Sequence, residues 1–113
     1  MNILLLGNGA REHALAWKLS KSPLCTNLYI APGNPGTATC GTNVPLPVND
    51  FEKIAGFIRD TLIDMVICGP EEPLVKGLED YLMELQGFDK LMFVGPSARG
   101  AMLEGSKAYA KEF

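Results

Sequence analysis

The chain has 113 residues, of which 47% are hydrophobic and 20% are charged, and its formal net charge at pH 7 is −3. This length favours a single domain, and the acidic balance argues against a nucleic-acid partner, which would require a basic patch. No apolar run approaches the ~20 residues of a membrane helix, and the N-terminus lacks the basic segment of a secretory signal. We therefore expect a cytoplasmic protein without a membrane partner.

The cysteines and the single histidine do not suggest a metal or redox site. Cys25, Cys40 and Cys68 lie far apart and form no C-x-x-C pair, and His13 is the one histidine. In a reducing compartment such cysteines are typically buried or idle thiols. We expect no metal-binding residues in this chain.

The first twenty residues predict a strand, a glycine-rich turn and a helix. Residues 2–6 are an apolar run of strand length, residues 7–10 read Gly-Asn-Gly-Ala, and residues 11–20 fit a helix. The residues expected on or near the buried side of this helix are Ala14, Leu15, Trp17 and Leu19. The turn would present the free N–H groups of the helix N-terminus to a ligand, and these groups favour an anion such as phosphate.

The later elements alternate between strands and helices. We expect strands at residues 27–30, 65–68 and 91–94, a long loop at 31–43, an extended segment at 44–47, and helices at 50–62, 74–86, from 97 onward and at 106–113. Asn49 or Asp50 should cap the second helix, with Glu52 placed to return a hydrogen bond to Asn49. This alternation predicts an α/β fold with a Rossmann-like open parallel sheet and helices on both faces.

Each of the four predicted strands ends at a glycine-bearing turn. Glycines 7, 33, 69 and 95 follow the strands closely, and right-handed crossovers would bring all four turns to one edge of the sheet. Open α/β sheets bind ligands at that carboxyl edge. We therefore expect a groove that is built largely from backbone.

A dinucleotide does not fit the first turn. The G-x-G-x-x-G fingerprint requires a small residue at position 12, where this chain has Glu12, and the acidic residue expected after the second strand is missing. A smaller phosphorylated metabolite fits better, with Arg11 either contacting it or remaining solvated. Glu12 would complement the helix dipole, and His13 is expected to be a hydrogen-bonded helix residue.

A second notable segment, residues 69–74, reads Gly-Pro-Glu-Glu-Pro-Leu. The two prolines restrict the backbone and would hold Glu71 and Glu72 in place at the carboxyl edge. A carboxylate here could accept hydrogen bonds from a substrate amine or from sugar hydroxyls. Alternatively, both acids could complement the dipole of the following helix.

Four motifs stand out in the chain: residues 7–14 (GNGAREHA), 31–37 (APGNPGT), 69–77 (GPEEPLVKG) and 103–107 (LEGSK). Together they resemble the phosphoribosylamine–glycine ligase family, also called glycinamide ribonucleotide synthetase. The resemblance covers essentially the whole chain in order, although Ala10 replaces a frequent glycine and Glu72 a frequent alanine.

The resemblance implies the first domain of an ATP-grasp ligase. Such an enzyme uses ATP to phosphorylate the glycine carboxylate, and the amine of 5-phosphoribosylamine then attacks the acyl phosphate. The partners would be phosphoribosylamine, glycine and ATP, with Mg²⁺ or Mn²⁺, and ATP and metal would be bound mainly by ATP-grasp domains absent from this chain. Residues 1–105 would form the substrate-binding domain and residues 106–113 the start of the connection.

The turns and the resemblance together give the predicted site. The predicted substrate-binding residues are Gly7, Asn8, Gly9, Ala10, Arg11, Gly33, Asn34, Gly36, Gly69, Pro70 and Glu71. Lys107 is the predicted ATP contact, and no catalytic residue is expected in this chain, which should be inactive alone. Two alternatives remain open: the first domain of another ATP-grasp ligase or carboxylase, and a complete metabolite-binding module.

Overall fold

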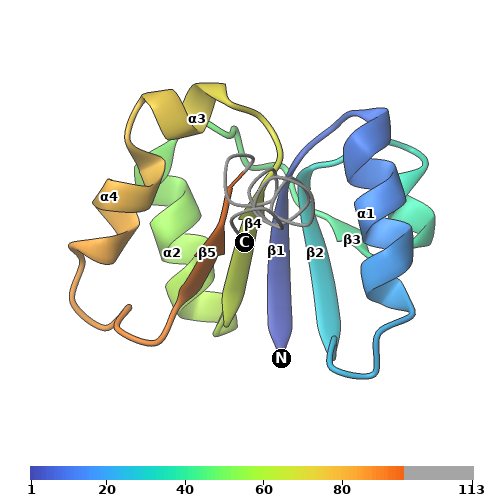
Figure 1. The fold of residues 1–113 in the computed structure, drawn as a ribbon, viewed down its shortest axis with the longest axis horizontal. Helices are drawn as coiled ribbons and strands as arrows, with labels where there is room; N and C mark the ends of the chain where they lie inside the picture. Colours follow the sequence, from blue (N-terminus) through green and yellow to red (C-terminus); the bar gives the residue numbers. More distant parts are fainter. Residues whose placement is uncertain (96–113) are drawn as a thin grey trace, which may run out of the picture.

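The computed structural model describes residues 1–95, which form a five-stranded, all-parallel sheet (Figure 1). In sheet order the strands are β3 (Thr42–Asn43), β2 (Asn27–Pro32), β1 (Asn2–Gly7), β4 (Met65–Cys68) and β5 (Met92–Val94). The chain thus begins in the centre, builds outward to β3, and then crosses to β4 and β5. This order confirms the predicted Rossmann-like parallel sheet.

Helices cover both faces of the sheet. The helix α1 (Ala10–Ser20) packs on one face, and α2 (Phe51–Thr61) lies on the other with α3 (Glu72–Val75) and α4 (Leu78–Met83) (Figure 1). Helices on both sides require strands that are apolar on both sides, and every residue of β1 from Ile3 to Gly7 is buried.

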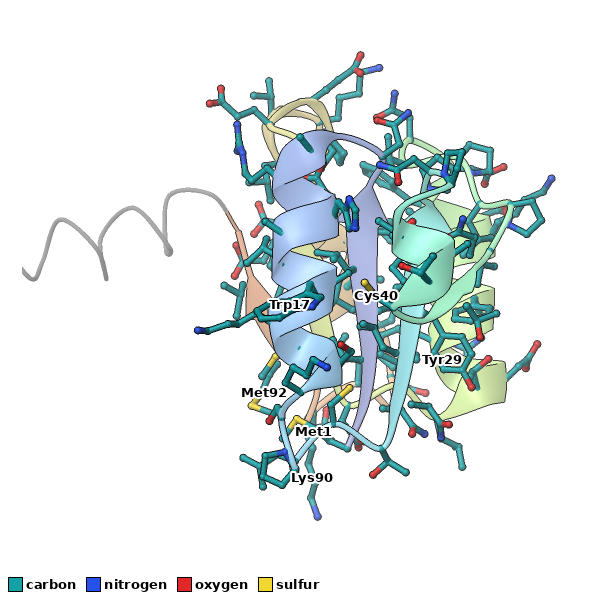
Figure 2. The ribbon with its side chains drawn as sticks, turned by 90° about the vertical axis from the view of Figure 1, so that its right-hand side faces the viewer. Met1, Trp17, Tyr29, Cys40, Lys90 and Met92 are labelled. Atoms are coloured by element: carbon teal, nitrogen blue, oxygen red, sulfur yellow. The ribbon has the colours of Figure 1, made fainter. Side chains whose placement is uncertain are left out.

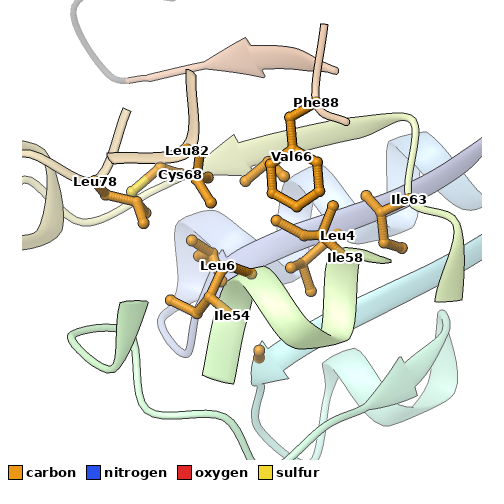
Figure 3. Packing of buried hydrophobic residues seen from close by; sticks show 12 residues of the cluster. Leu4, Leu6, Ile54, Ile58, Ile63, Val66, Cys68, Leu78, Leu82 and Phe88 are labelled. Atoms are coloured by element: carbon orange, nitrogen blue, oxygen red, sulfur yellow. The ribbon is translucent and has the colours of Figure 1, made fainter. Parts of the chain in front are cut away.

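The side chains of β1 alternate between two hydrophobic clusters. Leu4 and Leu6 pack with Ile54 and Ile58 of α2 (Figure 3), whereas Ile3 and Leu5 pack toward α1. Ile54 is fully buried. The α2 side therefore contains the larger cluster and anchors the fold.

Two sequence-based expectations about secondary structure need correction. The loop predicted at 31–43 contains the short edge strand β3 and a 3₁₀ turn, η1 (Thr37–Thr39). Two residues carry too little pattern for strand recognition. The helix predicted at 74–86 is divided into α3 and α4 at Gly77, whose φ of +91° is left-handed. Glycine adopts this conformation readily, so it interrupts an otherwise helical pattern.

The orientation of α1 also differs from the prediction. Ala14 is exposed and Trp17 is 54% exposed, pointing away from the sheet (Figure 2), although both were expected near the core. Ala16 is buried instead, and Leu15 and Leu19 pack partly against the α1-side cluster. The Trp17 ring has the ammonium of Lys21 5.6 Å from its centroid, a cation–π contact that suits an exposed indole.

Two further predictions fall on residues that the structure does not describe. The helix expected from Ser97 and the helix expected at 106–113 both lie outside residues 1–95. The domain boundary at residue 105 and the position of Lys107 also lie outside this range.

Candidate functional site

The turns after β1, β2 and β4 converge at the carboxyl edge of the sheet. Gly33 donates its N–H to the carbonyl of Gly7 over 3.0 Å, and Gly69 donates to the carbonyl of Leu6, also over 3.0 Å. Both bonds continue the parallel ladder beyond the strands. They fix the three turns side by side at the end of the sheet where α1 begins (Figure 1).

A shallow groove of about 280 Å³ lies between the first and third of these turns. Its lining residues are Asn8, Gly9, Ala10, Arg11, Glu12, Gly69 and Pro70. Six of them belong to the predicted site, and Glu12 is the addition. The volume lies just below the usual range for ligand pockets, about 300–1,000 Å³, so the groove suits a small metabolite or one part of a larger ligand.

The N-terminus of α1 opens into this groove without a side-chain cap. Its N-cap residue is Gly9, which has no side chain to accept a hydrogen bond from the first turn. Within residues 1–95, no acceptor is recorded for the N–H groups of Ala10 and Arg11. The first-turn N–H groups of a helix need an external partner, and the helix dipole favours an anionic one.

Glu12 has a larger structural role than dipole complementarity. Only 7% of it is exposed, and its Oε1 accepts a hydrogen bond of 2.9 Å from the N–H of Gly9. A Cβ at Gly7 or Gly69 would collide with its carboxylate. The side chain therefore fills the space between two turns, and both glycines are required because Glu12 occupies that space.

The sequence contained a signal for this arrangement. Glu12 lies three residues after the N-cap, the position from which an acidic residue returns a hydrogen bond to the cap N–H in a capping box. Glycine at the cap conceals the motif, which is usually recognised by serine or threonine.

Asn34 connects the β2 turn to the β1 turn. Its side-chain N–H₂ donates to the carbonyl of Asn8 over 2.9 Å and to that of Gly9 over 3.3 Å, while its Oδ1 accepts from the N–H of Thr37 over 2.9 Å. Both ends of the amide are thus engaged within the protein. Asn34 thus connects to two residues that line the groove, Asn8 and Gly9, but neither Asn34 nor Gly33 nor Gly36 lines it.

Gly36 is close to His13 of α1. A Cβ at Gly36 would lie 2.5 Å from the Nδ1 and Cε1 atoms of the His13 ring. The His13 backbone N–H donates to the carbonyl of Gly9, but its exposed side chain makes no hydrogen bond recorded within residues 1–95, contrary to the expectation of a hydrogen-bonded histidine. Close packing of the loop on the ring accounts for the glycine at position 36.

The acidic pair after β4 separates into two environments. Glu72 pairs with Lys76 at 3.4 Å, and a hydrogen bond from Asn49 together with this lysine lowers the pKa of Glu72 below its ordinary value. This engagement explains why Asn49 does not cap α2, which is capped by the other predicted candidate, Asp50. Glu71 is exposed beside Pro70 but does not line the groove.

A larger hollow of about 430 Å³ lies at the opposite, amino edge of the sheet. Its lining residues are Ile58, Arg59, Leu62, Ile63, Asp64, Gly87, Phe88, Lys90 and Leu91. The C-terminus of α2 faces this edge, and helix C-termini disfavour anions. The Arg59 guanidinium lies 5.4 Å from the centroid of the Phe88 ring. We therefore place the candidate site at the smaller groove.

Metal-ligating clusters and membrane-spanning helices are two further features that bear on function within residues 1–95. Residues 1–95 contain no group of three or more histidine, cysteine or acidic side chains that could hold a metal ion. Within the same range, no helix is long and apolar enough to cross a membrane.

The three cysteines all lie within residues 1–95, and none of them forms a disulfide there. Burial raises the pKa of the Cys25 thiol. The Cys68 thiol donates a hydrogen bond to the carbonyl of Pro70 over 3.2 Å.

Comparison with known proteins agrees with the resemblance in the sequence. The chain is 50% identical to a phosphoribosylamine–glycine ligase of Nostoc sp. over 98% of its length and 46% identical to that of Escherichia coli K12 over 100%; it covers 26% of each relative. It is also 46% identical to the bifunctional purine biosynthetic protein ADE1 of Schizosaccharomyces pombe, of which it covers 14%.

A solved structure shows the same likeness. The crystal structure of phosphoribosylamine–glycine ligase from Thermotoga maritima aligns with 99% of this chain and 24% of its own, with a TM-score of 0.52 and 28% sequence identity. The chain thus spans about a quarter of the length of the ligases it matches. The family model described as "Phosphoribosylglycinamide synthetase, N domain" matches residues 1–104, and the chain belongs to this family.

Proposed function

We propose that this chain is the sugar-phosphate-binding, N-terminal domain of a cytoplasmic ligase of purine biosynthesis. The complete ligase would use ATP to join glycine to 5-phosphoribosylamine, giving glycinamide ribonucleotide, ADP and phosphate. The family match and the names of the relatives support this proposal. The activity itself would require the remainder of the ligase, because the chain spans only about a quarter of such relatives.

The observation that carries the proposal is the uncapped N-terminus of α1 at the groove. The N–H groups of Ala10 and Arg11 would bind the phosphate of phosphoribosylamine, as helix N-termini commonly bind phosphates. The Arg11 side chain, which is exposed and lines the groove, would add a charge-assisted contact. Asn8 and the Gly69–Pro70 turn would border the sugar.

The other predicted site residues would act at the margin of the groove or behind it. Asn34 and Gly33 would hold the β1 turn in place through their hydrogen bonds to it. Gly36 would admit the His13 ring, and buried Gly7 would admit Glu12. Glu71 remains a candidate to accept a hydrogen bond from the substrate amine, because it is exposed and directly follows Pro70.

The nucleotide and the metal would be bound elsewhere in the ligase. Residues 1–95 offer no metal-binding cluster, so we assign Mg²⁺ or Mn²⁺ and most contacts with ATP to ATP-grasp domains that follow this one in cis. Residues 1–105 would form the substrate domain, and residues 106–113 would begin the connection. Lys107 would contact the ATP phosphates.

A titration of the chain with glycinamide ribonucleotide tests this proposal. A few charge-assisted hydrogen bonds contribute about 1.5–3 kcal/mol each, whereas association costs about 4–15 kcal/mol. We therefore expect binding at millimolar concentrations, with amide NMR shifts at residues 8–12 and 69. The chain alone should release no ADP from ATP in the presence of glycine and phosphoribosylamine. Shifts confined to the hollow at the amino edge would contradict the proposal.

A further inference from the structure

Glu12 is a buried carboxylate inside the groove that we assign to the sugar phosphate. It lines the groove, yet only 7% of its surface is exposed. Burying a charge is costly unless the charged group has hydrogen-bonding partners. The partners of each carboxylate oxygen therefore bear on what the groove binds.

The two carboxylate oxygens of Glu12 differ in their hydrogen-bonding partners. Oε1 accepts the N–H of Gly9 over 2.9 Å, whereas no donor to Oε2 is recorded within residues 1–95. Neither of the two ion pairs in that range, Asp50 with Lys53 and Glu72 with Lys76, includes Glu12. Oε2 lies against Gly69, at the opposite wall of the groove. One acceptor is thus buried at the ligand site with its hydrogen-bonding capacity unused.

The groove combines two kinds of group with opposite preferences. The N–H groups of Ala10 and Arg11 favour an anion, while a carboxylate repels an anion and accepts hydrogen bonds from hydroxyl or amine groups. A ligand that satisfies both must carry a phosphate and, a few atoms away, hydrogen-bond donors. A sugar monophosphate meets this requirement. A second phosphate group would be repelled by Glu12.

We propose that Glu12 is a specificity-determining residue whose Oε2 accepts a hydrogen bond from a ring hydroxyl of the sugar phosphate. This inference rests on the proposed function and adds to it the group that recognises the sugar. Glu12 would then have two roles. Oε1 accepts the N–H of the N-cap residue, Gly9, and so fixes the start of α1. Oε2 distinguishes a hydroxyl-bearing sugar phosphate from a phosphate ester without hydroxyl groups.

The test compares two ligands and three forms of the 113-residue chain by amide NMR titration. Ribose 5-phosphate carries ring hydroxyls, and tetrahydrofurfuryl phosphate has the ring and the phosphate without them. The variant Glu12→Gln retains a carbonyl oxygen for the Gly9 N–H, as glutamine does in capping boxes, but replaces the second acceptor with a donor. Glu52→Gln is the matched control, because Glu52 lies in the first turn of α2, is exposed, and loses the same charge.

Wild type and Glu52→Gln should bind ribose 5-phosphate about tenfold more tightly than tetrahydrofurfuryl phosphate, the factor expected for one hydrogen bond to a charged group. In Glu12→Gln this preference should fall to about twofold or less. In wild type, ribose 5-phosphate should shift the ¹³C resonance of the Glu12 carboxyl group, whereas tetrahydrofurfuryl phosphate should not. This readout requires no variant.

Three results would overturn the inference. Equal affinities of wild type for the two ligands would remove the role of the hydroxyl groups, even if Glu12→Gln proved unfolded. An unchanged tenfold preference in a folded Glu12→Gln variant would leave Glu12 with its structural role only; in both cases the proposed function would stand. If neither ligand shifted the amides of Ala10 and Arg11 in wild type, the proposed function would fail together with the inference.

Discussion

The helices α1 and α2 are both 11 residues long and both begin near the carboxyl edge of the sheet, but their N-termini differ. The N-cap of α2 is Asp50, whose carboxylate accepts the N–H of Lys53 over 3.2 Å. The N-cap of α1 is Gly9, and Ala10 and Arg11, whose N–H groups have no acceptor recorded within residues 1–95, line the groove. One helix closes its own N-terminus, and the other leaves it available to a ligand.

The two helices also contribute differently to the core. In α2, Ile54, Ala55 and Ile58 are buried, whereas in α1 the buried residues are Ala16 and Glu12. The helix with the larger apolar face is the one that carries its own cap. Stability and binding are therefore assigned to separate helices, and substitutions that affect one without the other can test this division.

The largest expected effect is on the core of α2. Ile54→Ala should lower the free energy of unfolding by about 2–5 kcal/mol, because it leaves a cavity at a fully buried position. Leu15→Ala on α1 removes a partly buried side chain and should cost roughly half as much or less. Urea unfolding followed by far-UV circular dichroism measures both. Equal costs would show that α1 anchors the core as strongly as α2.

Gly7→Ala should disrupt the start of α1 from within the sheet. The residue has a φ of +136°, and an added Cβ would collide with the Glu12 side chain. Strain and overpacking together should cost about 2–4 kcal/mol of unfolding free energy.

Gly56→Ala in α2 is the matched control. Its Cβ would meet nothing within 4 Å, so the variant should gain up to about 1 kcal/mol from helix propensity. The same urea experiment compares the two alanine variants. A stabilised Gly7→Ala variant would refute the assigned position of Glu12.

The caps themselves give a smaller effect. Asp50→Ala removes the cap of α2 and should cost about 1 kcal/mol, whereas Gly9→Ser at the N-cap of α1 should change stability by only a few tenths. The serine hydroxyl would instead occupy the first-turn amides, so ribose 5-phosphate should bind several-fold more weakly. Thermal unfolding and the amide titration separate the two readouts. Undiminished binding by a folded Gly9→Ser variant would argue against a phosphate at these amides.

The smallest expected effect concerns the link between α2 and α3. Hydrogen bonds from Asn49 and Lys76 lower the pKa of Glu72, so this interaction stabilises the fold fully above the ordinary carboxyl pKa. It is lost as the pH falls through the lower, folded-state pKa. Asn49→Ala should raise the pKa of Glu72 toward its ordinary value in a ¹³C carboxyl titration. An unchanged pKa would mean that Asn49 does not hold Glu72.

The sequence predicted the architecture well because its strands are short, apolar and separated by glycine turns. It located β4 at the residues observed and α1 to within one residue. It did not reveal β3, which has two residues and pairs only at the edge. It also missed the break at Gly77, because a glycine within an apolar helical pattern does not by itself show that φ is positive.

The candidate site was predicted only in part, because some of its features depend on local sequence and others on contacts between distant segments. Local spacing identified the turn residues and the open N-terminus of α1. The roles of Asn34 and Glu12 depend on contacts between different turns. Asn34 and Asn8, for example, are 26 residues apart in the sequence. Such contacts follow from the sheet topology, which places residues from different turns together.

The amides at the two helix N-termini provide the most direct test of the account. Ribose 5-phosphate is added to the ¹⁵N-labelled chain, and the shifts of Ala10 and Arg11 in α1 are compared with those of Phe51 and Glu52 in α2. The account predicts that the α1 amides shift in a saturable manner while the α2 amides do not. Equal shifts at both helices, or shifts at α2 alone, would contradict it.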